Sequence, residues 1–560
     1  MQSMDCEPLS ADRRKRATRS AGRSLRLGVL LIASLCAVEL ALADVGGEPA
    51  AGWWSHMQVL ASDALEGRLT GEAGHRKAVE YAAEQFKKAG LKPAGTQGYF
   101  QPIEFVSRQI DESKSRLELL RGGQSQVLDF AQDAYLVPAP DLAAKLEAPL
   151  VFVGHGLTIP ERGIEDLKGV DLKGKVAVFL AGAPSSVLGP LSAHAQSLQE
   201  RWKVFKGAGA VGWVAIPDPN NMDIPWPRIS NSRNQPAITF ADTSLLETPG
   251  LRLRVTVNPA HAEKWFEGSG HSFDEIVSAA KEGKALPRFD LPQRIRAVAT
   301  QRARQIKSDN VVALMEGSDP KLKSEYVVAT AHIDHLGIGN PVNGDTIYNG
   351  AMDNAAGSSA VLDVAFRLAG SKEKPRRSVL FLLVTAEEKG LLGSKYFAKR
   401  PTVPGKAIVA DLNVDNPLPL YPLKSLIVLG LDESDLGDDI RAVGARNGLS
   451  ILPDPQPKRN SFIRSDQYSF IREGIPALAL KVGFQAGSSE EATQKKWLTE
   501  RYHAPSDDLQ QPIDRQTMEG FDAAFTQLVL AVADRDRRPK WKDSSFFRRY
   551  AYNSSVRGRR

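Results

Sequence analysis

Three neighbouring stretches decide the fold: YVVATAHID at residues 326–334, SSAVLDVAFRLAG at 358–370 and SVLFLLVTAEE at 378–388. The first and the third begin as apolar runs rich in β-branched residues, which is typical of strands buried on both faces. The middle stretch repeats apolar residues at the spacing of a helix. A strand, a helix and a second strand in this order form a parallel pair with a helical crossover, so these residues predict an α/β fold.

The same alternation continues on the C-terminal side. AIVADLNV (407–414) and ALALKV (477–482) have the pattern of strands, and EGFDAAFTQLVLAVAD (519–534) has the pattern of a helix. Strands that alternate with helices predict an α/β sandwich around a largely parallel sheet.

The N-terminal half has a different texture. Residues 74–90 repeat apolar residues at helical spacing and end in a glycine, which predicts an amphipathic helix. Between residues 145 and 300, short β-branched runs are broken by glycine and proline, as in KGKVAVFLAG (173–182). This pattern predicts a small β-rich domain.

Composition and charge exclude several classes of protein. The 560 residues are 42% hydrophobic and 25% charged, as in a soluble globular protein with several domains. The formal net charge is +6, but residues 1–43 hold seven basic and four acidic residues, and residues 534–560 hold ten and three. The body between them holds 55 basic and 59 acidic residues. It lacks the basic excess of a nucleic-acid-binding domain, so we expect no nucleic-acid partner.

The first 43 residues have the pattern of a secretory signal. A basic segment from Arg13 to Arg26 precedes an apolar run at 27–38 and the small-residue site Ala41-Leu42-Ala43. We expect cleavage after Ala43 and a periplasmic or secreted protein. The chain's two cysteines, Cys6 and Cys36, lie in this segment, so the mature chain holds none and disulfide or thiolate chemistry is excluded.

Polar side chains gather where the predicted strands end, which is where open α/β sheets bind ligands. One imidazole and one carboxylate follow the first strand, a pair of glutamates follows the second, and others lie in neighbouring loops. The candidates are His332, Asp334, Asp353, Glu387, Glu388, Asp415 and His503. Two imidazoles and three carboxylates suit two divalent cations when one carboxylate bridges them, and zinc is the metal we expect.

Two short motifs suggest roles for individual residues. His332 and Asp334 face the same way in an extended segment, so the carboxylate can accept a hydrogen bond from the imidazole. The adjacent glutamates Glu387 and Glu388 cannot point in one direction, so one can bind metal while the other acts as general base. His335 follows in the predicted turn, and we expect a loop role for it.

Six motifs together resemble a known family: AHIDHLG (331–337), NGAMDNAAGSSAVLDVA (349–365), VTAEEKGLLGS (384–394), NVDN (413–416), FIRSDQYSFIREGIPAL (462–478) and YHAPSDD (502–508). They are similar to the two-zinc exopeptidases that include bacterial secreted aminopeptidases and glutamate carboxypeptidase II. Residues 60–95 resemble the opening of the same catalytic domain. APLVFVGHGL (148–157), GVDLKGKVAVFLAG (169–182) and KGAGAVGWVAI (206–216) resemble an inserted protease-associated domain.

The resemblance implies a three-layer sandwich around a mostly parallel mixed sheet. It divides the chain into a signal peptide (1–43), a discontinuous catalytic domain (44–144 and 301–533), the inserted protease-associated domain (145–300) and a basic tail (534–560). The tail combines positive charge with aromatic residues, which suggests a weak contact with an anionic membrane surface. No motif indicates an oligomeric state.

The resemblance also implies a role for each site residue. Asp353 bridges two zinc ions, His332 and Asp415 complete one site, and Glu388 and His503 complete the other. Glu387 becomes the general base, and Tyr502 matches a tyrosine that steadies the oxyanion in relatives. The peptide bond between Asp353 and Asn354 is expected to be cis.

The function we expect is that of a zinc aminopeptidase acting on peptides through a water activated at the two metals. A carboxypeptidase or dipeptidase of the same fold is the main alternative, because Arg459 and Arg464 can approach the site. Exopeptidases whose extra domain follows the double glutamate are disfavoured, since the insertion here precedes His332. A glutaminyl cyclase would hold one zinc, and a receptor-like binding protein would have lost ligands, whereas all five are present.

Overall fold

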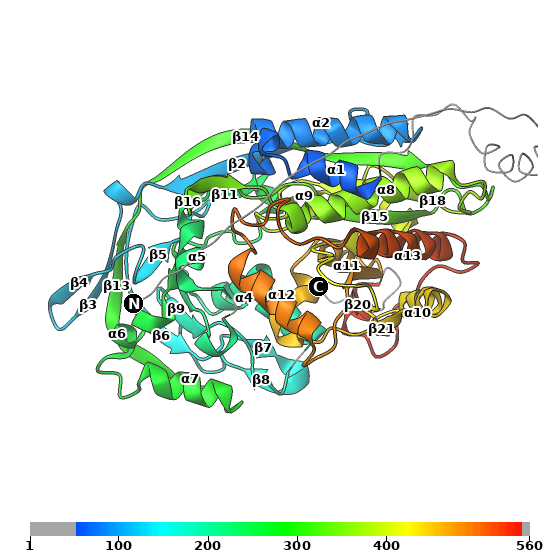
Figure 1. Cartoon of the computed structure of the whole chain (residues 1–560). Coiled ribbons are helices and arrows are strands. Elements are labelled where there is room, and N and C mark those ends of the chain that lie inside the picture. Colours follow the sequence, from blue (N-terminus) through cyan, green and yellow to red (C-terminus); the bar gives the residue numbers. More distant parts are fainter. Residues whose placement is uncertain (1–51, 188, 223, 552–560) are drawn as a thin grey trace, which may run out of the picture. The chain divides into compact units, whose positions relative to one another are not determined.

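The computed structural model describes residues 52–187, 189–222 and 224–551 (Figure 1). The predicted cleavage site after Ala43 lies outside these residues. No helix in the described ranges is long and apolar enough to cross a membrane.

The four predicted strands of the second half form the centre of a ten-stranded mixed sheet. They are β15 (Tyr326–His332), β18 (Ser378–Val384), β19 (Ile408–Val414) and β22 (Ala477–Val482). All four run parallel in the order β18-β15-β19-β22. Antiparallel strands flank them, with β14 (Gln301–Met315) next to β18 and β20 (Ser425–Leu429) next to β22. The predicted α/β class with a mixed sheet is confirmed. Within the described residues, four of the nine strand pairings of this sheet are parallel, and they include the three at its centre.

Helices cover both faces of this sheet (Figure 1). Alternate residues of a strand point to opposite faces. In β15, Val327 therefore joins the core under one set of helices, and Val328 joins the core against Phe397 and Phe470 on the other side. The first set comprises α1 (Trp53–Leu60), α2 (Ala73–Lys88), α8 (Ala356–Gly370) and α13 (Arg515–Ala533), and the second includes α9 (Leu392–Lys399) and α11 (Gln467–Arg472). These three layers are the predicted sandwich.

The remaining strands of the central sheet lie at its two ends. One end holds β11 (Ala237–Phe240), β2 (Phe100–Ile110) and β14 (Gln301–Met315), with β1 (Lys92–Pro93) paired to β14. The other holds β20 (Ser425–Leu429) and β21 (Ser450–Leu452), near α10 (Leu436–Asn447). The hairpin of β16 (Gly337–Val342) and β17 (Asp345–Tyr348) follows β15.

A second sheet has eight strands in the order β4-β3-β13-β6-β9-β10-β12-β5. Its strands are β3 (Arg116–Arg121), β4 (Gln124–Val127), β5 (Ala134–Leu136), β6 (Lys145–Val153), β9 (Val176–Leu180), β10 (Gly212–Ile216), β12 (Arg254–Val257) and β13 (Arg288–Val298). The helices in the same part of the chain are α3 (Pro190–Gln196), α4 (Leu198–Gly207), α5 (Trp226–Asn231), α6 (Glu263–Phe266) and α7 (Phe273–Lys281), and β7 (Thr158–Ile159) pairs with β8 (Ile164–Glu165).

The edges of this sheet differ from the predicted limits of 145 and 300. The sheet already includes β3, β4 and β5, which precede residue 145, because β3 pairs with β13 and β5 pairs with β12. Conversely, β11 lies inside the predicted range but pairs with β2 of the central sheet. Pairing between strands that are distant in sequence sets the edges of the sheet, and the local sequence pattern does not reveal such pairing.

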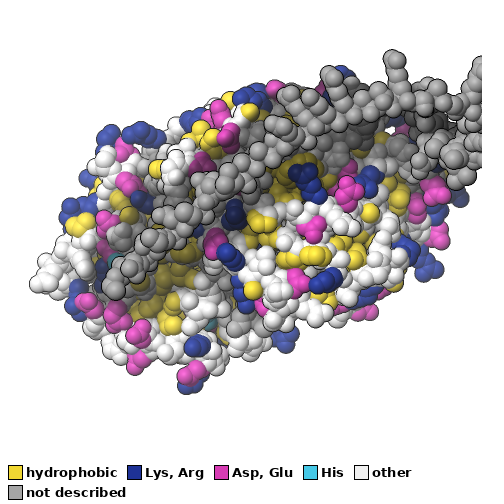
Figure 2. Space-filling model, in the orientation of Figure 1, with side chains coloured by type: hydrophobic (Ala, Val, Ile, Leu, Met, Phe, Trp, Pro, Cys, Tyr) yellow, Lys and Arg dark blue, Asp and Glu magenta, His cyan; other side chains and the backbone are white. Residues whose placement is uncertain are grey.

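The C-terminal segment is packed against the fold as far as residue 551, and the weak membrane contact expected of the basic tail stays a prediction. Trp541, Phe547 and Tyr550 are buried in the main core. The indole of Trp541 donates to the carbonyl of Gly474 at 3.0 Å, and Arg535 pairs with Asp435 at 2.7 Å. These three aromatic side chains are therefore part of the protein's own core. On the face shown in Figure 2, acidic and basic side chains are interspersed.

Candidate metal centre

The predicted site residues converge at the carboxyl ends of three adjacent parallel strands. His332 is the last residue of β15, Glu387 and Glu388 follow β18, and Asp415 follows β19. His332 pairs in register with Val384, the last residue of β18, so these strand ends lie side by side. The other two, Asp353 before α8 and His503 between α12 (Ser489–Glu500) and α13, approach from loops.

Asp353 lies between the two imidazoles. Its Oδ1 is 3.3 Å from His332 Nε2, and its Oδ2 is 3.3 Å from His503 Nε2. On the far side, Asp415 Oδ1 is 3.4 Å from His332 Nε2, and Glu388 Oε2 is 3.3 Å from His503 Nε2. The structure therefore gives two clusters that share one carboxylate, which is the arrangement that a bridging ligand requires.

His335 belongs to this site, whereas the sequence suggested only a loop role. Its Nδ1 lies 2.7 Å from Glu388 Oε1, and its ring is fully buried. One group of ligand atoms within 4.8 Å of one another is formed by His335, Asp353 and Glu388. Gly350 makes room for the ring, because a Cβ there would lie 2.4 Å from His335 Cδ2. The signal in the sequence that could have identified His335 as a site residue is its position as the second histidine of the AHIDHLG motif.

The other group of ligand atoms contains the predicted general base. Glu387, His332 and Asp415 offer atoms within 4.8 Å of one another. The Glu387 carboxylate thus lies beside one of the two clusters and Glu388 beside the other. This is the divergence expected of adjacent residues that follow a strand.

Asp334 is buried beneath the site, but its main partner differs from the predicted one. Its Oδ1 accepts a hydrogen bond from the backbone N–H of Glu387 at 3.0 Å, and its Oδ2 accepts one from Thr70 Oγ1 at 3.2 Å. His332 Nδ1 is closer to the Asp334 main-chain oxygen (3.2 Å) than to its carboxylate (3.8 Å). The Asp334 carboxylate therefore orients Glu387, and its backbone carbonyl faces the imidazole.

The loop that carries Asp353 is held by a residue that sequence reasoning did not single out. The Asp507 carboxylate accepts hydrogen bonds from the backbone N–H groups of Met352 at 3.0 Å and Asp353 at 3.1 Å. The Asp353–Asn354 peptide bond is cis, as the resemblance implies. The Asn354 side chain donates to the carbonyl of Val414 at 2.9 Å, next to Asp415. The acidic pair that ends YHAPSDD was the signal for Asp507.

Burial and mutual charge shape the protonation of the site. Burial raises the pKa of Glu387 well above its usual value. Burial alone would lower the pKa of His503, but Glu388 and Asp353 raise it to about 10. The carboxylates outnumber the imidazoles, and His503 Nε2 has no hydrogen-bond partner among the described residues. Buried carboxylates and imidazoles are ligands that divalent zinc accepts, so the residues present fit this metal.

Arg68 supports the site from below. It is fully buried, and burial lowers its pKa to about 10. Its guanidinium donates to the carbonyl groups of Ile333 at 2.8 Å, Asn349 at 2.6 Å and Gly350 at 3.0 Å. It thereby joins the end of β15 to the loop before Asp353.

Tyr502 lies against His503, with ring centroids 3.8 Å apart and planes 21° apart. Burial raises the pKa of Tyr502 well above its usual value, so its hydroxyl stays protonated and able to donate. The structure therefore places this hydroxyl-bearing ring beside His503, and its role at the oxyanion stays a prediction.

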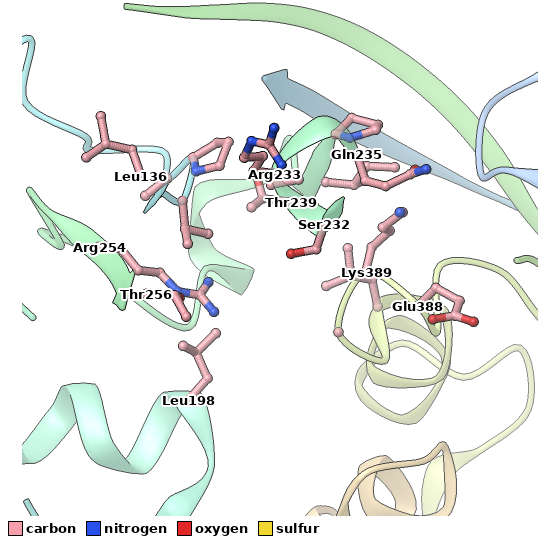
Figure 3. Close-up of a pocket in the computed structure, with 18 of the residues that line it drawn as sticks. Leu136, Leu198, Ser232, Arg233, Gln235, Thr239, Arg254, Thr256, Glu388 and Lys389 are labelled. Atoms are coloured by element: carbon pink, nitrogen blue, oxygen red, sulfur yellow. The ribbon is translucent and has the colours of Figure 1, made fainter. Parts of the chain in front are cut away.

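Three cavities meet at the centre. One of about 100 Å³ is lined by Asp353, Glu387 and Asp415 together with apolar side chains such as Phe484. A second, of about 640 Å³, lies beside Glu387 and Glu388. The third, of about 460 Å³, extends from Glu388 to Arg254 of the second sheet (Figure 3). A reacting molecule therefore has room on more than one side of the clustered ligands.

The two groups of imidazoles and carboxylates at the edge of a mixed sheet agree with the class that the comparisons give, a zinc-dependent metallopeptidase. Residues 310–529 match the model described as Peptidase family M28, and they hold every metal-ligand candidate as well as Glu387. This part of the chain matches that family, and the predicted resemblance of the catalytic motifs to zinc exopeptidases is confirmed.

Individual relatives agree with this assignment. The chain is 28% identical to leupeptin-inactivating enzyme 1 of Streptomyces exfoliatus over 193 residues. This matched stretch makes up 34% of this chain and 39% of the relative. It is 28% identical over 213 residues to a probable leucine aminopeptidase 2 of Aspergillus fumigatus, with 36% and 39% covered. The chain thus matches less than half the length of these relatives.

A solved structure has the same fold over a larger part of the chain. An aminopeptidase from Aneurinibacillus sp. strain AM-1 superimposes with a TM-score of 0.53 at 20% identity, covering 87% of this chain and 95% of that one. At this identity the likeness concerns the fold alone.

Proposed function

We propose that this protein is a two-zinc exopeptidase that removes N-terminal residues from peptides. The observation that carries the proposal is the position of Asp353, which turns one carboxylate oxygen to His332 and the other to His503. His332 and Asp415 would hold one zinc, and Glu388 and His503 the other. His335, at 2.7 Å from Glu388, is placed either to orient that carboxylate or to join it as a ligand.

Zinc held by these residues would supply the Lewis acidity that polarises a scissile carbonyl and makes water more acidic. Glu387 accepts a proton from the attacking water and returns it to the nitrogen of the leaving amine. The hydrogen bond from its backbone N–H to Asp334 keeps the side chain at the reacting centre. The Tyr502 hydroxyl donates a hydrogen bond to the oxygen on which negative charge develops.

The relative named as a probable leucine aminopeptidase supports a substrate with a free α-amino group. We therefore expect a short peptide and its C-amidated form to be hydrolysed, and the N-acetylated form to be inert. The measurement compares initial rates for the three peptides with zinc-loaded protein. Loss of hydrolysis on amidation alone would reverse the assignment to aminopeptidases.

One observation favours a second function, cleavage of short peptides that carry a free C-terminal carboxylate. In β12, Val255 and Val257 face the core, so Arg254 and Thr256 face the cavity that reaches Glu388 (Figure 3). The Arg254 guanidinium lies 5.9 Å from the ring centroid of Trp213, and within the described residues no carboxylate pairs with it. An arginine in this state suits a carboxylate ligand.

The two functions are separated by the ratio of kcat/KM for a free-acid peptide to that for its amide. If Arg254 binds the C-terminus, this ratio exceeds one in the wild type and falls toward one in Arg254→Met. Arg252→Met is the matched control, because Arg252 is exposed and does not line the cavity. A ratio of one in the wild type would show that the enzyme does not recognise a C-terminal carboxylate, and the second function would be rejected.

We further propose that the second sheet is a protease-associated domain and that the protein is exported. The first proposal is supported by the motifs at 148–216, which supply three of its strands. Export is supported by the signal pattern before Ala43.

We expect the exported protein to begin at Asp44, because cleavage follows the small-residue site. Intact mass of protein recovered from outside the inner membrane checks this. A mature N-terminus before residue 27, or a chain retained in the membrane fraction, would show that the segment is not a cleaved signal.

A further inference from the structure

A helix of the second-sheet region is tied to the loop that carries His503. Arg228 lies on α5, within the segment between β10 and β11. Its Nη1 donates to the carbonyl oxygens of Leu498 at 3.2 Å and Tyr502 at 3.0 Å, and its Nη2 donates to that of Thr499 at 2.7 Å. One guanidinium thus spans the end of α12 and the peptide bond that enters His503.

These carbonyls need an outside donor. The last carbonyl groups of a helix lack partners within the helix, and a cationic side chain there also interacts favourably with the helix dipole. Around them, the Trp497 carbonyl receives the N–H groups of Arg501 and Tyr502, and the Glu500 carbonyl receives the Ser506 hydroxyl. Arg228 supplies the donors for the carbonyls that remain.

The loop at His503 has an unusual backbone that requires support. His503 has φ of 55°, in the left-handed region that residues with a Cβ rarely adopt. The Tyr502 carbonyl belongs to the same peptide plane as the His503 nitrogen, so Arg228 restricts the rotation of that plane. A change in this plane would move the imidazole away from Glu388 and Asp353.

Arg228 itself is anchored on the side of the second sheet. Its neighbour Trp226 donates to the carbonyl of Ala131 at 2.9 Å and packs against the ring of Tyr135 in β5. Within the part of the chain that the structure describes, no carboxylate forms an ion pair with Arg228. Its donors are directed to the His503 loop and not to a surface salt bridge.

We propose that Arg228 is a positioning residue that holds the Tyr502–His503 peptide, and with it the imidazole of one of the two metal sites. This proposal rests on the proposed two-zinc function. It makes the second-sheet region part of what assembles the metal centre, although that region contributes no candidate ligand.

The test is a zinc titration of the full chain in metal-buffered solution, with bound zinc per chain measured against free zinc. We expect two uptake steps in the wild type. Arg228→Gln should weaken one step by about 10- to 100-fold, the usual effect of losing a residue that orients a metal ligand. Arg228→Lys should fall between the two, because an ammonium group reaches fewer of the three carbonyls.

Two controls separate positioning from a general loss of structure. Arg233 lies in the same segment, but its guanidinium contacts Ser230 and Glu112 and not the His503 loop. Arg233→Gln should therefore keep both steps of zinc uptake. The metal-free forms of the two variants should melt at similar temperatures. In a His503→Ala background, Arg228→Gln should weaken zinc binding no further, because the two changes act on one ligand.

Three results would overturn the proposal: two unchanged steps in Arg228→Gln, an equal loss of both steps with a lower melting temperature of the metal-free chain, or a further loss in the His503→Ala background. If the wild type takes up fewer than two zinc ions, the proposed function fails and the Arg228 proposal fails with it. Two wild-type steps with an unchanged variant reject the Arg228 proposal alone.

Discussion

Glu387→Gln is expected to lower kcat by a factor of about 10² to 10⁴ while the zinc content stays at the wild-type value. Glutamine keeps the size of the side chain but cannot accept the proton of the attacking water. The backbone hydrogen bond from residue 387 to Asp334 does not involve the side chain, so the variant should keep its place at the site.

The measurement is metal analysis of the purified variant beside its turnover of an aminoacyl anilide. Glu500→Gln, which changes an exposed glutamate at the end of α12, is the control for the substitution itself. Loss of zinc from Glu387→Gln would assign Glu387 to the ligands of His332 and Asp415, beside which it lies. Full activity would exclude it as the general base.

Glu388→Ala is expected to lose both activity and metal. Its carboxylate faces His503 at 3.3 Å through Oε2 and His335 at 2.7 Å through Oε1. Removing it leaves two imidazoles and the shared Asp353 as the ligand candidates of this cluster. With one anionic ligand fewer, the affinity of the cluster for zinc should fall sharply. The cluster of His332 and Asp415 keeps its own ligands.

We therefore expect about one zinc ion per chain in Glu388→Ala at a free zinc concentration that saturates the wild type with two. Metal analysis and turnover at rising free zinc measure this, with Glu500→Ala as control. A fully loaded variant would contradict the role given to Glu388. If Glu387→Gln loses turnover but keeps its zinc, and Glu388→Ala loses both, the two adjacent glutamates have separate functions.

The parallel core of the sheet could be predicted from sequence because its signals are local. Buried strands such as β15 and β18 are continuous apolar runs, and α8 between them shows helical spacing within a few turns. The second sheet includes strands that precede the predicted inserted segment of residues 145–300. The pairing of β3 with β13 joins segments more than 170 residues apart, and no local pattern reports such a pairing.

The same division holds within the site. The motifs identified the ligand candidates because polar residues stood out where apolar strands ended, and His332, Asp353, Glu388, Asp415 and His503 do lie together. The roles of Asp507 and His335 were not visible. Each depends on a contact with a side chain or backbone group that is distant in sequence.

By itself, the sequence determined the order of strands and helices, the absence of cysteine after residue 43 and the residue types available for metal binding. Only the tertiary structure decided that Asp353 faces two imidazoles, that Asp334 holds the backbone of Glu387 and that Arg228 reaches the loop of His503. The physical reason is the separation along the sequence of the residues involved. Periodicity and charge are properties of neighbouring residues, whereas a hydrogen bond between residues 228 and 502 exists only once two layers of the fold have packed.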